Sequence, residues 1–103
     1  MYFLLYNVKK GDEPVQRIPY KNKEIIWRIV DDEAVLLDPQ QGKYYGLNPV
    51  GCSFWEKVDG VKSTADIINL LLQEYRVERD VLAKDIEELI CALESKSLLK
   101  FIS

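Results

Sequence analysis

The sequence predicts an α+β domain in which three helices cover one face of a three-stranded antiparallel sheet. Three short segments rich in β-branched and aromatic residues lie between residues 24 and 47. Three segments with helical signals follow between residues 49 and 96. A three-stranded sheet needs such cover to be stable. The 103 residues suffice for one hydrophobic core, so we expect a single domain.

The three predicted strands follow one another as a meander. Residues 24–30 have high β-propensity, and the polar turn at residues 31–33 leads into a second strand at residues 34–37. Residues 38–42 form a strong turn signal, because proline presets φ and the closing glycine accepts a positive φ. Residues 43–47 then return as the third strand. A meander pairs this strand with the second and leaves its other side open.

Capping residues mark where the predicted helices begin. Asn48 caps a helix over residues 49–58, whose first residue is a proline that needs no hydrogen-bonded N–H. A serine and an aspartate three residues apart form a capping box at residues 63–66, and this second helix extends to about residue 76. The third helix spans residues 79–96. Its core-facing side chains are expected to be Leu82, Ile86, Leu89, Ile90 and Leu93.

Composition argues against catalysis and against duplex binding. The chain has no histidine, which removes the commonest general base and metal ligand. Cys52 and Cys91 form no CxxC pair, so we expect two buried free thiols, although a disulfide between them stays open. Cys52 or Ser53 as a nucleophile lacks an evident base. The net charge of −3 disfavours phosphate contacts. We therefore expect no enzyme, no cofactor, no metal and no nucleic acid.

The first 22 residues are expected to form an N-terminal extension that is partly strand-like. Its apolar residues 1–6 are too few for a membrane span and lack the flanks of a signal peptide, so we expect a cytoplasmic protein without a membrane partner. Residues 15–22 suit an extended segment or a loop. Three roles stay open for the first six residues: lengthening the sheet, pairing with a second copy in a homodimer, or occupying the open edge.

The central and C-terminal residues resemble the PqqD-like family. The resemblance covers residues 24–99 and leaves the predicted domain at residues 23–103. Ser97 departs from it, because the family often has glycine there. The order and spacing that carry the resemblance belong to Gly42, Tyr44, Tyr45, Gly46, Leu47, Asn48, Gly51, Phe54, Trp55, Asp59, Gly60, Thr64, Ile67, Tyr75, Val77, Asp85, Ile86, Leu98 and Leu99.

This resemblance implies a winged helix-turn-helix-like domain that recognises peptides. Such domains bind the leader of a ribosomally made, post-translationally modified precursor peptide and deliver it to a processing enzyme. The leader adds as a strand to the third strand and lies in a groove beside the third helix. The peptide-binding residues expected from this placement are Lys43, Tyr44, Tyr45, Gly46, Leu47, Val81, Leu82, Asp85, Ile86, Glu88 and Leu89. Which face of the third strand lines the groove stays open.

The sequence leaves several functions open. A lasso peptide pathway is favoured, where the partner resembles a transglutaminase-type cysteine protease and the leader often offers a Tyr-x-x-Pro motif. A chaperone in pyrroloquinoline quinone synthesis is the second option. A winged-helix nucleic-acid-binding protein is a third, although the third helix is acidic, and a subunit adaptor without a peptide ligand is a fourth. Leu82, Ile86 and Leu89 also suit a role in the core alone.

Overall fold

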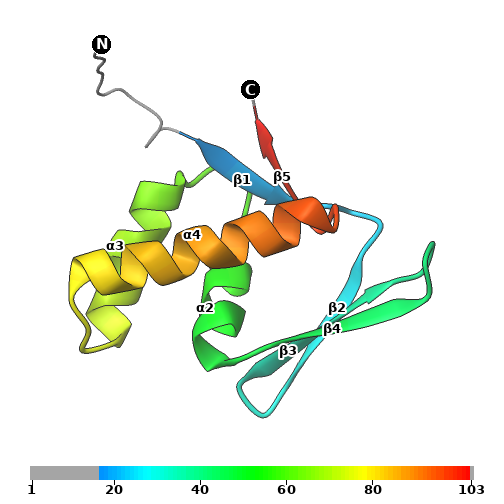
Figure 1. Cartoon of the computed structure of the whole chain (residues 1–103), viewed down its shortest axis with the longest axis horizontal. Coiled ribbons are helices and arrows are strands. Elements are labelled where there is room, and N and C mark those ends of the chain that lie inside the picture. Colours follow the sequence, from blue (N-terminus) through cyan, green and yellow to red (C-terminus); the bar gives the residue numbers. More distant parts are fainter. Residues whose placement is uncertain (1–16, 103) are drawn as a thin grey trace.

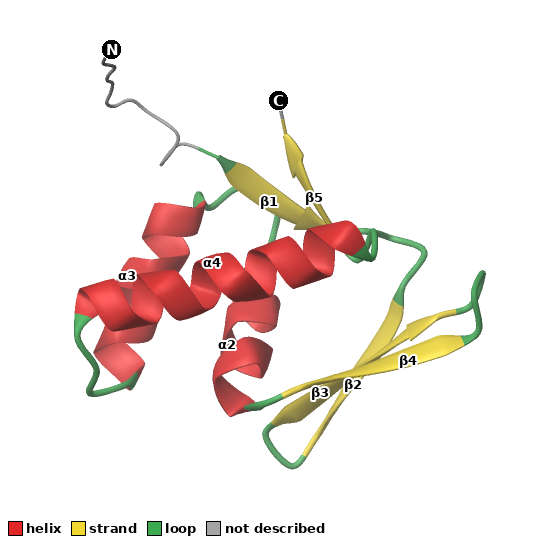
Figure 2. Cartoon of the chain, in the orientation of Figure 1, coloured by secondary structure: helices red, strands yellow, loops and turns green. Residues whose placement is uncertain are grey.

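Three helices and two small antiparallel sheets make up the fold (Figures 1 and 2). The structure is a computed structural model that describes residues 17–102, so the predictions for residues 1–8 lie outside the described part. None of the described helices is long and apolar enough to span a membrane. In chain order the elements are β1 (Ile18–Lys21), β2 (Ile26–Val30), β3 (Glu33–Asp38), β4 (Lys43–Leu47), α2 (Pro49–Lys57), α3 (Thr64–Glu74), α4 (Arg79–Ser95) and β5 (Leu99–Ile102).

The larger sheet is the predicted meander, with strand order β2-β3-β4. Asp31 and Asp32 both have positive φ, at 51° and 65°, which makes the first turn type I′. Asp38 organises the second turn, since its Oδ1 accepts from the backbone N–H of Gln40 at 3.0 Å. Gly42 closes that turn with φ at 67°. Both hairpins are therefore specified locally, as the sequence predicts.

One face of this sheet is covered mainly by α2, and α3 and α4 pack against α2. Ala34 and Leu36 of β3 and Leu47 of β4 share that face and are buried. Against them α2 packs the fully buried rings of Phe54 and Trp55. Figure 1 shows α4 crossing in front of both α2 and α3. The predicted combination of a three-stranded sheet and three helices is confirmed.

A second, two-stranded sheet joins β1 to β5 and was not predicted. Pro19 lies opposite Phe101 in this antiparallel pair. Lys21 links the pair to the core, because its Nζ donates to the Val58 carbonyl at 2.6 Å and lies 5.0 Å from the centre of the Trp27 ring. Residues 18–21 of the predicted extension thus pack with the domain. The predicted boundary at residue 22 stays a prediction.

The end of α4 explains why a glycine suits position 97. Ser97 has φ at 59°, and its N–H donates to the Glu94 carbonyl at 3.0 Å. The N–H of Leu98 donates to the Leu93 carbonyl at 2.9 Å. These two bonds, with Leu98 and Leu93 both buried, form a Schellman motif. Its left-handed position usually holds glycine, and here serine occupies it.

Replacing Ser97→Gly is expected to stabilise the fold. The left-handed conformation costs a non-glycine residue about 1–2 kcal/mol, and the greater freedom of glycine in the unfolded chain offsets about 0.4–1 kcal/mol of that gain. A net gain of roughly 0.5–1 kcal/mol should raise the urea midpoint at unchanged m-value. Ser95→Gly is the matched control, because residue 95 is helical and glycine there should lower the midpoint. A lower midpoint for Ser97→Gly would contradict the assignment.

Candidate functional site: a groove between β4 and α4

The free edge of β4 presents the backbone groups of Tyr44 and Gly46. A type I′ turn makes its flanking residues, Val30 and Glu33, a hydrogen-bonded pair. Hydrogen-bonded and non-bonded pairs alternate along an antiparallel ladder. The same alternation continues from the β2–β3 pair to the β3–β4 pair. It leaves the N–H and C=O groups of Tyr44 and Gly46 without a bond to β3, so these groups point away from that strand. In the described part of the chain no strand pairs with this edge.

The side chains of β4 divide between the two faces of the sheet. Tyr45 and Leu47 lie opposite the buried residues Leu36 and Ala34 and therefore face the helices. Tyr44 is 71% exposed on the opposite face. Gly46 shares that face, and a Cβ there would meet no atom within 4 Å. The structure thus places Tyr45 and Leu47 on the helix side, a question that the sequence left open.

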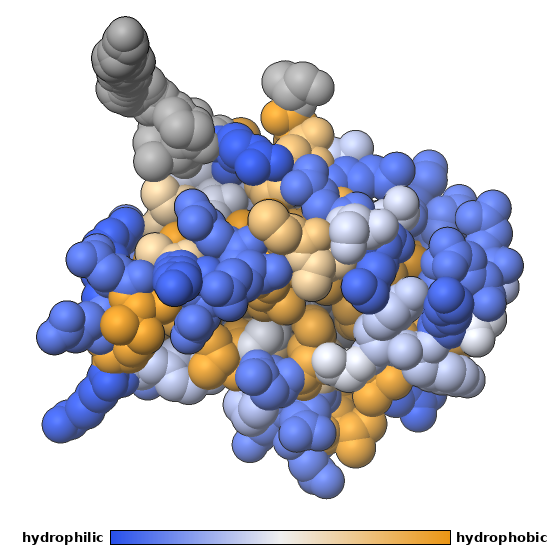
Figure 3. Space-filling model, in the orientation of Figure 1, coloured by the Kyte–Doolittle hydropathy of each residue, from blue (hydrophilic) through white to orange (hydrophobic). Residues whose placement is uncertain are grey.

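A cavity of about 650 Å³ lies between the end of β4 and the first half of α4. Apolar side chains gather at this place in the space-filling view, between the two elements and with polar residues around them (Figure 3). Strand, helix and connecting segments all contribute to it. The lining residues are Gly46, Leu47, Asn48, Val50, Gly51, Tyr75, Arg76, Val77, Leu82, Asp85, Ile86, Glu88 and Leu89.

The cavity brings together most of the residues expected to bind a peptide. Those of the predicted set that line it are Gly46, Leu47, Leu82, Asp85, Ile86, Glu88 and Leu89. Lys43, Tyr44 and Tyr45 lie at the start of β4, and none of them lines the cavity. Val81 is 52% exposed on α4 and is also outside it. Leu82 and Ile86 are buried while lining the cavity, so they serve the core and the groove together.

Two segments of the lining were not predicted. The first is the start of α2, where Val50 and Gly51 close the floor beside the cap Asn48. A Cβ at Gly51 would lie 3.3 Å from the Leu47 Cβ and 3.7 Å from the Leu89 Cδ2, so glycine at this position avoids crowding two side chains of the lining. The second is the connection between α3 and α4, residues 75–77. Tyr75 and Val77 are among the residues that carry the resemblance to the PqqD-like family, but the resemblance assigned them no role in binding.

Hydrogen bonds hold the Tyr75 ring at the end of the cavity. Its hydroxyl lies 3.1 Å from the Ser53 Oγ and donates to the Pro49 carbonyl at 3.4 Å. Asn48 orders the same helix end, because its Oδ1 accepts from the Gly51 N–H at 2.8 Å. The start of α2 and the α3–α4 connection therefore form one rigid end wall.

The polar rim of the groove changes sign along its length. Asp85 and Glu88 are exposed on α4 beside the cavity, and Arg76 lines its end. At the other end of α4, the Lys96 Nζ lies 5.9 Å from the centre of the Tyr45 ring. Lys43 begins β4 at that same end of the strand. The groove thus carries two carboxylates and one guanidinium at the cavity, and two lysines toward the C-terminus of α4.

The two residues considered as nucleophiles are poorly suited to that role. Burial raises the pKa of the Cys52 thiol, and the carboxylates of Glu56 and Asp32 raise it further. A raised pKa disfavours the reactive thiolate. The half-buried Ser53 is engaged by the Tyr75 hydroxyl. Within residues 17–102, no group of three or more His, Cys, Asp and Glu side chains is arranged to hold a metal ion.

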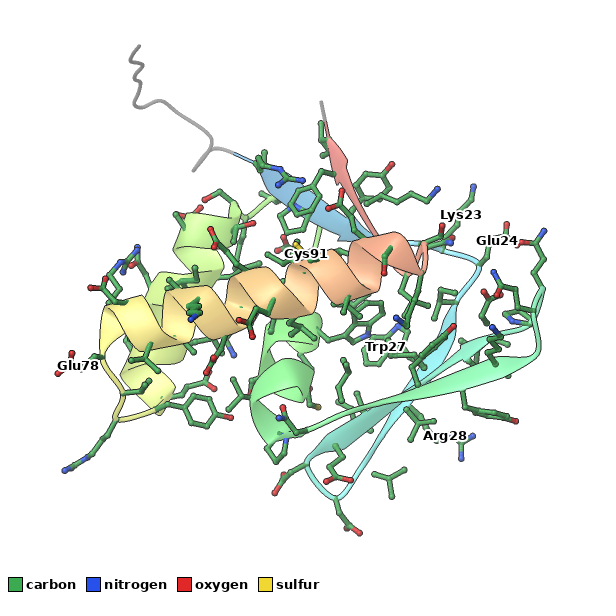
Figure 4. The ribbon with its side chains drawn as sticks, in the orientation of Figure 1. Lys23, Glu24, Trp27, Arg28, Glu78 and Cys91 are labelled. Atoms are coloured by element: carbon green, nitrogen blue, oxygen red, sulfur yellow. The ribbon has the colours of Figure 1, made fainter. Side chains whose placement is uncertain are left out.

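The cysteines differ in exposure. Both are free thiols, as expected, and Cys52 is buried. Cys91 is exposed, so the prediction of two buried thiols is wrong for this residue. Figure 4 shows Cys91 on the side of α4 that faces away from β4. Its position on α4 follows from helical periodicity, which separates residue 91 from the core-facing Ile90 by about 100°.

Comparison with known proteins identifies relatives of the same architecture. Residues 33–99 match the model of the family described as coenzyme PQQ synthesis protein D (PqqD). Among solved structures, TbiB1 in complex with the TbiA(beta) leader peptide is 32% identical, with a TM-score of 0.73 over 79% of this chain and 94% of that one. A lasso peptide synthetase B1 complexed with the leader peptide is 29% identical, with a TM-score of 0.71 over 80% and 96%. No match was found among curated protein sequences.

Proposed function

This chain belongs to the PqqD family, and on that premise we propose that it binds the leader region of a precursor peptide and presents it to a processing enzyme. The leader peptidase of a lasso peptide pathway is the favoured recipient. Both similar solved structures are complexes with a leader peptide, and one is a lasso peptide synthetase component. The observation that carries the proposal is the open β4 edge lying directly beside an apolar cavity.

Strand addition to β4 accounts for how a leader engages both features. Main-chain hydrogen bonds form with Tyr44 and Gly46, whose backbone groups face outward. In an antiparallel arrangement, leader residues opposite these two project to the outer face of the sheet. The leader residue opposite Tyr45 projects toward α4 instead. An apolar side chain just beyond, near Leu47, then reaches the cavity lined by Leu82 and Leu89.

Charge contributes less to affinity than these anchors. Asp85 and Glu88 are exposed, and each pair with a leader Lys or Arg is worth about 0–1 kcal/mol. Burying one large apolar side chain contributes about 1.5–3 kcal/mol. The acidic rim therefore selects among leaders and orients them, while the cavity and the strand edge supply most of the binding free energy.

Two other functions differ in their support. The family description names coenzyme PQQ synthesis, so a chaperone for the precursor of that pathway is the second candidate. Nucleic-acid binding has no such support. Helix α4 carries five acidic residues against two basic ones, which repels phosphate. Asp85 and Glu88, both exposed on this helix, add to that repulsion.

An amide titration tests the proposed function. Chain labelled with ¹⁵N is titrated with the leader of a lasso precursor and, separately, with that of a quinone-cofactor precursor; a scrambled lasso leader is the control. We expect saturable shifts at Tyr44, Gly46 and the first half of α4 with one leader and none with the scrambled peptide. Shifts confined to β1 and β5, or none with either leader, would overturn the proposal.

A further inference from the structure

Among residues 17–102, no strand pairs with the other edge of the larger sheet, which is β2. All five residues of β2 are exposed, and apart from Arg28 they are apolar. The ladder alternation that exposes Tyr44 and Gly46 on β4 directs the backbone groups of Trp27 and Ile29 to the free edge of β2. An apolar edge strand without lysine or proline is a template for another strand.

The outer face of the sheet continues this apolar edge. Ile26, Arg28 and Val30 project from β2 to the face that the helices leave uncovered. Ile26 is 59% exposed and Val30 is 50% exposed. Figure 4 shows Arg28 on this face and Trp27 on the helix side of the same strand. A depression of about 320 Å³ on this part of the sheet is lined by Ile26, Trp27, Arg28, Val35, Leu37 and Tyr44.

Arg28 is the only charged residue of β2 and stands at its centre. Within residues 17–102 no carboxylate lies within salt-bridge distance of its guanidinium. Ile26 and Val30, two residues before and two residues after Arg28, lie on the same face and are apolar. A strand that pairs with β2 therefore meets one cation between apolar neighbours.

This arrangement opposes pairing with a second copy. In a two-fold antiparallel pair of β2 strands, Trp27 and Ile29 of both copies form ladder bonds only when Trp27 faces Ile29 of the other strand. That register sets Arg28 directly opposite Arg28 in a non-hydrogen-bonded pair, where side chains approach most closely. Like charges opposite each other destabilise a sheet. A register centred on Ile29 needs Asp31 to extend the strand, and its φ of 51° prevents this. A register centred on Trp27 sets Ile29 opposite Ile25, whose N–H is not free, because it donates to the Asn22 carbonyl at 3.0 Å.

We propose that the β2 edge is a second docking site, which takes an extended apolar strand of a partner protein that carries a carboxylate opposite Arg28. The partner's carboxylate forms an ion pair with the Arg28 guanidinium, whereas a second copy of the chain would set another Arg28 in that position. The partner's other side chains cover Ile26 and Val30 on the outer face and Trp27 and Ile29 on the helix side. None of the β2 residues lines the cavity beside α4.

The position of the β2 edge allows the partner and the leader to bind at the same time, an inference that rests on the proposed function. β2 and β4 are opposite edges of one three-stranded sheet. A leader on β4 and a partner strand on β2 can therefore bind at once, as the outer strands of a five-stranded sheet. The chain then holds the partner protein at a set distance from the leader.

Self-association tests the role of Arg28 without any partner. In sedimentation equilibrium we expect the wild-type chain and the Arg28→Lys variant to keep the 12.0 kDa monomer mass over a dilution series. Arg28→Val removes the repulsion and supplies a strand-forming side chain, so this variant should shift reversibly to the dimer mass. Lys100→Val is the matched control, because it removes an exposed cation from β5, an edge strand outside this site, and it should stay monomeric. A dimeric wild-type chain, or a monomeric Arg28→Val variant, contradicts the proposal.

Charge reversal tests the partner's chemistry. The probes are two capped nine-residue peptides of alternating threonine and valine, one with a central glutamate and one with a central lysine. The glutamate peptide should shift the amides of Trp27 and Ile29 and bind several-fold more tightly than the lysine peptide. Arg28→Glu should reverse this order. Equal affinities, an unreversed order, or no shifts at residues 26–30 reject the site, and a leader that still shifts Tyr44 and Gly46 leaves the proposed function standing.

Discussion

Replacing Gly46→Pro is expected to weaken leader binding about 10- to 100-fold while the chain stays folded. The Gly46 N–H faces the open edge, so proline removes no bond to β3. The lost donor and the bulk of the ring leave a leader carbonyl unpaired, at about 1–3 kcal/mol. Each 1.4 kcal/mol corresponds to a tenfold change in Kd. Calorimetric or fluorescence titration with the leader measures the change, with a dye attached to the exposed Cys91 in the second case.

The opposite edge of the same sheet provides the control. Ile29→Pro also removes an outward-facing N–H, and that residue lies far from the cavity lining. It should leave leader affinity within about twofold, since no bond to the leader involves β2. Urea unfolding of both variants confirms that each is folded. Equal losses for the two prolines would show that the leader does not add to β4.

Replacing Phe54→Ala is expected to lower the free energy of unfolding by about 3–5 kcal/mol. The ring is fully buried on α2 against the sheet, in the same cluster as Leu36 and Leu71. Its removal leaves a cavity that the surrounding side chains fill only in part. A small domain has roughly 5–15 kcal/mol of stability, so much of it is lost. The urea midpoint measures the change, provided that the m-value is unchanged.

Tyr44→Ala is the matched control for this loss, because it also deletes an aromatic ring. Tyr44 is exposed on the outer face of β4 and contributes little to the core. Its truncation should change the free energy of unfolding by about 0.5 kcal/mol or less. Comparable losses for the two variants would mean that the core does not lie between α2 and the sheet.

Much of the fold could be predicted because its signals act between near neighbours. The Asp31–Asp32 turn, the glycine at 42 and the Asn48 cap each specify the chain direction within a few residues. These positions, with the β-propensity of residues 26–47, place β2, β3 and β4 in their order. Both edges of the meander follow from that order, including the open edge of β4.

The candidate site was predicted in part for the same reason. Periodicity placed Leu82, Ile86 and Leu89 on one face of α4, and all three line the cavity. Val50 and residues 75–77 were missed, because their place in the lining depends on how α2 and α3 meet α4. No local pattern encodes that contact.

By itself, the sequence determined β2, β3, β4, the three helices and the caps Asn48 and Ser63, since each depends on residue type and short spacing. Tertiary structure alone decided that β1 pairs with β5, that α4 lies beside the β4 edge, and that Arg28 faces away from the helices. The pairing of β1 with β5 joins residues as far apart in the chain as Ile18 and Ile102. These tertiary features are set by which apolar faces pack together, a property of the assembled core and not of any short stretch of chain.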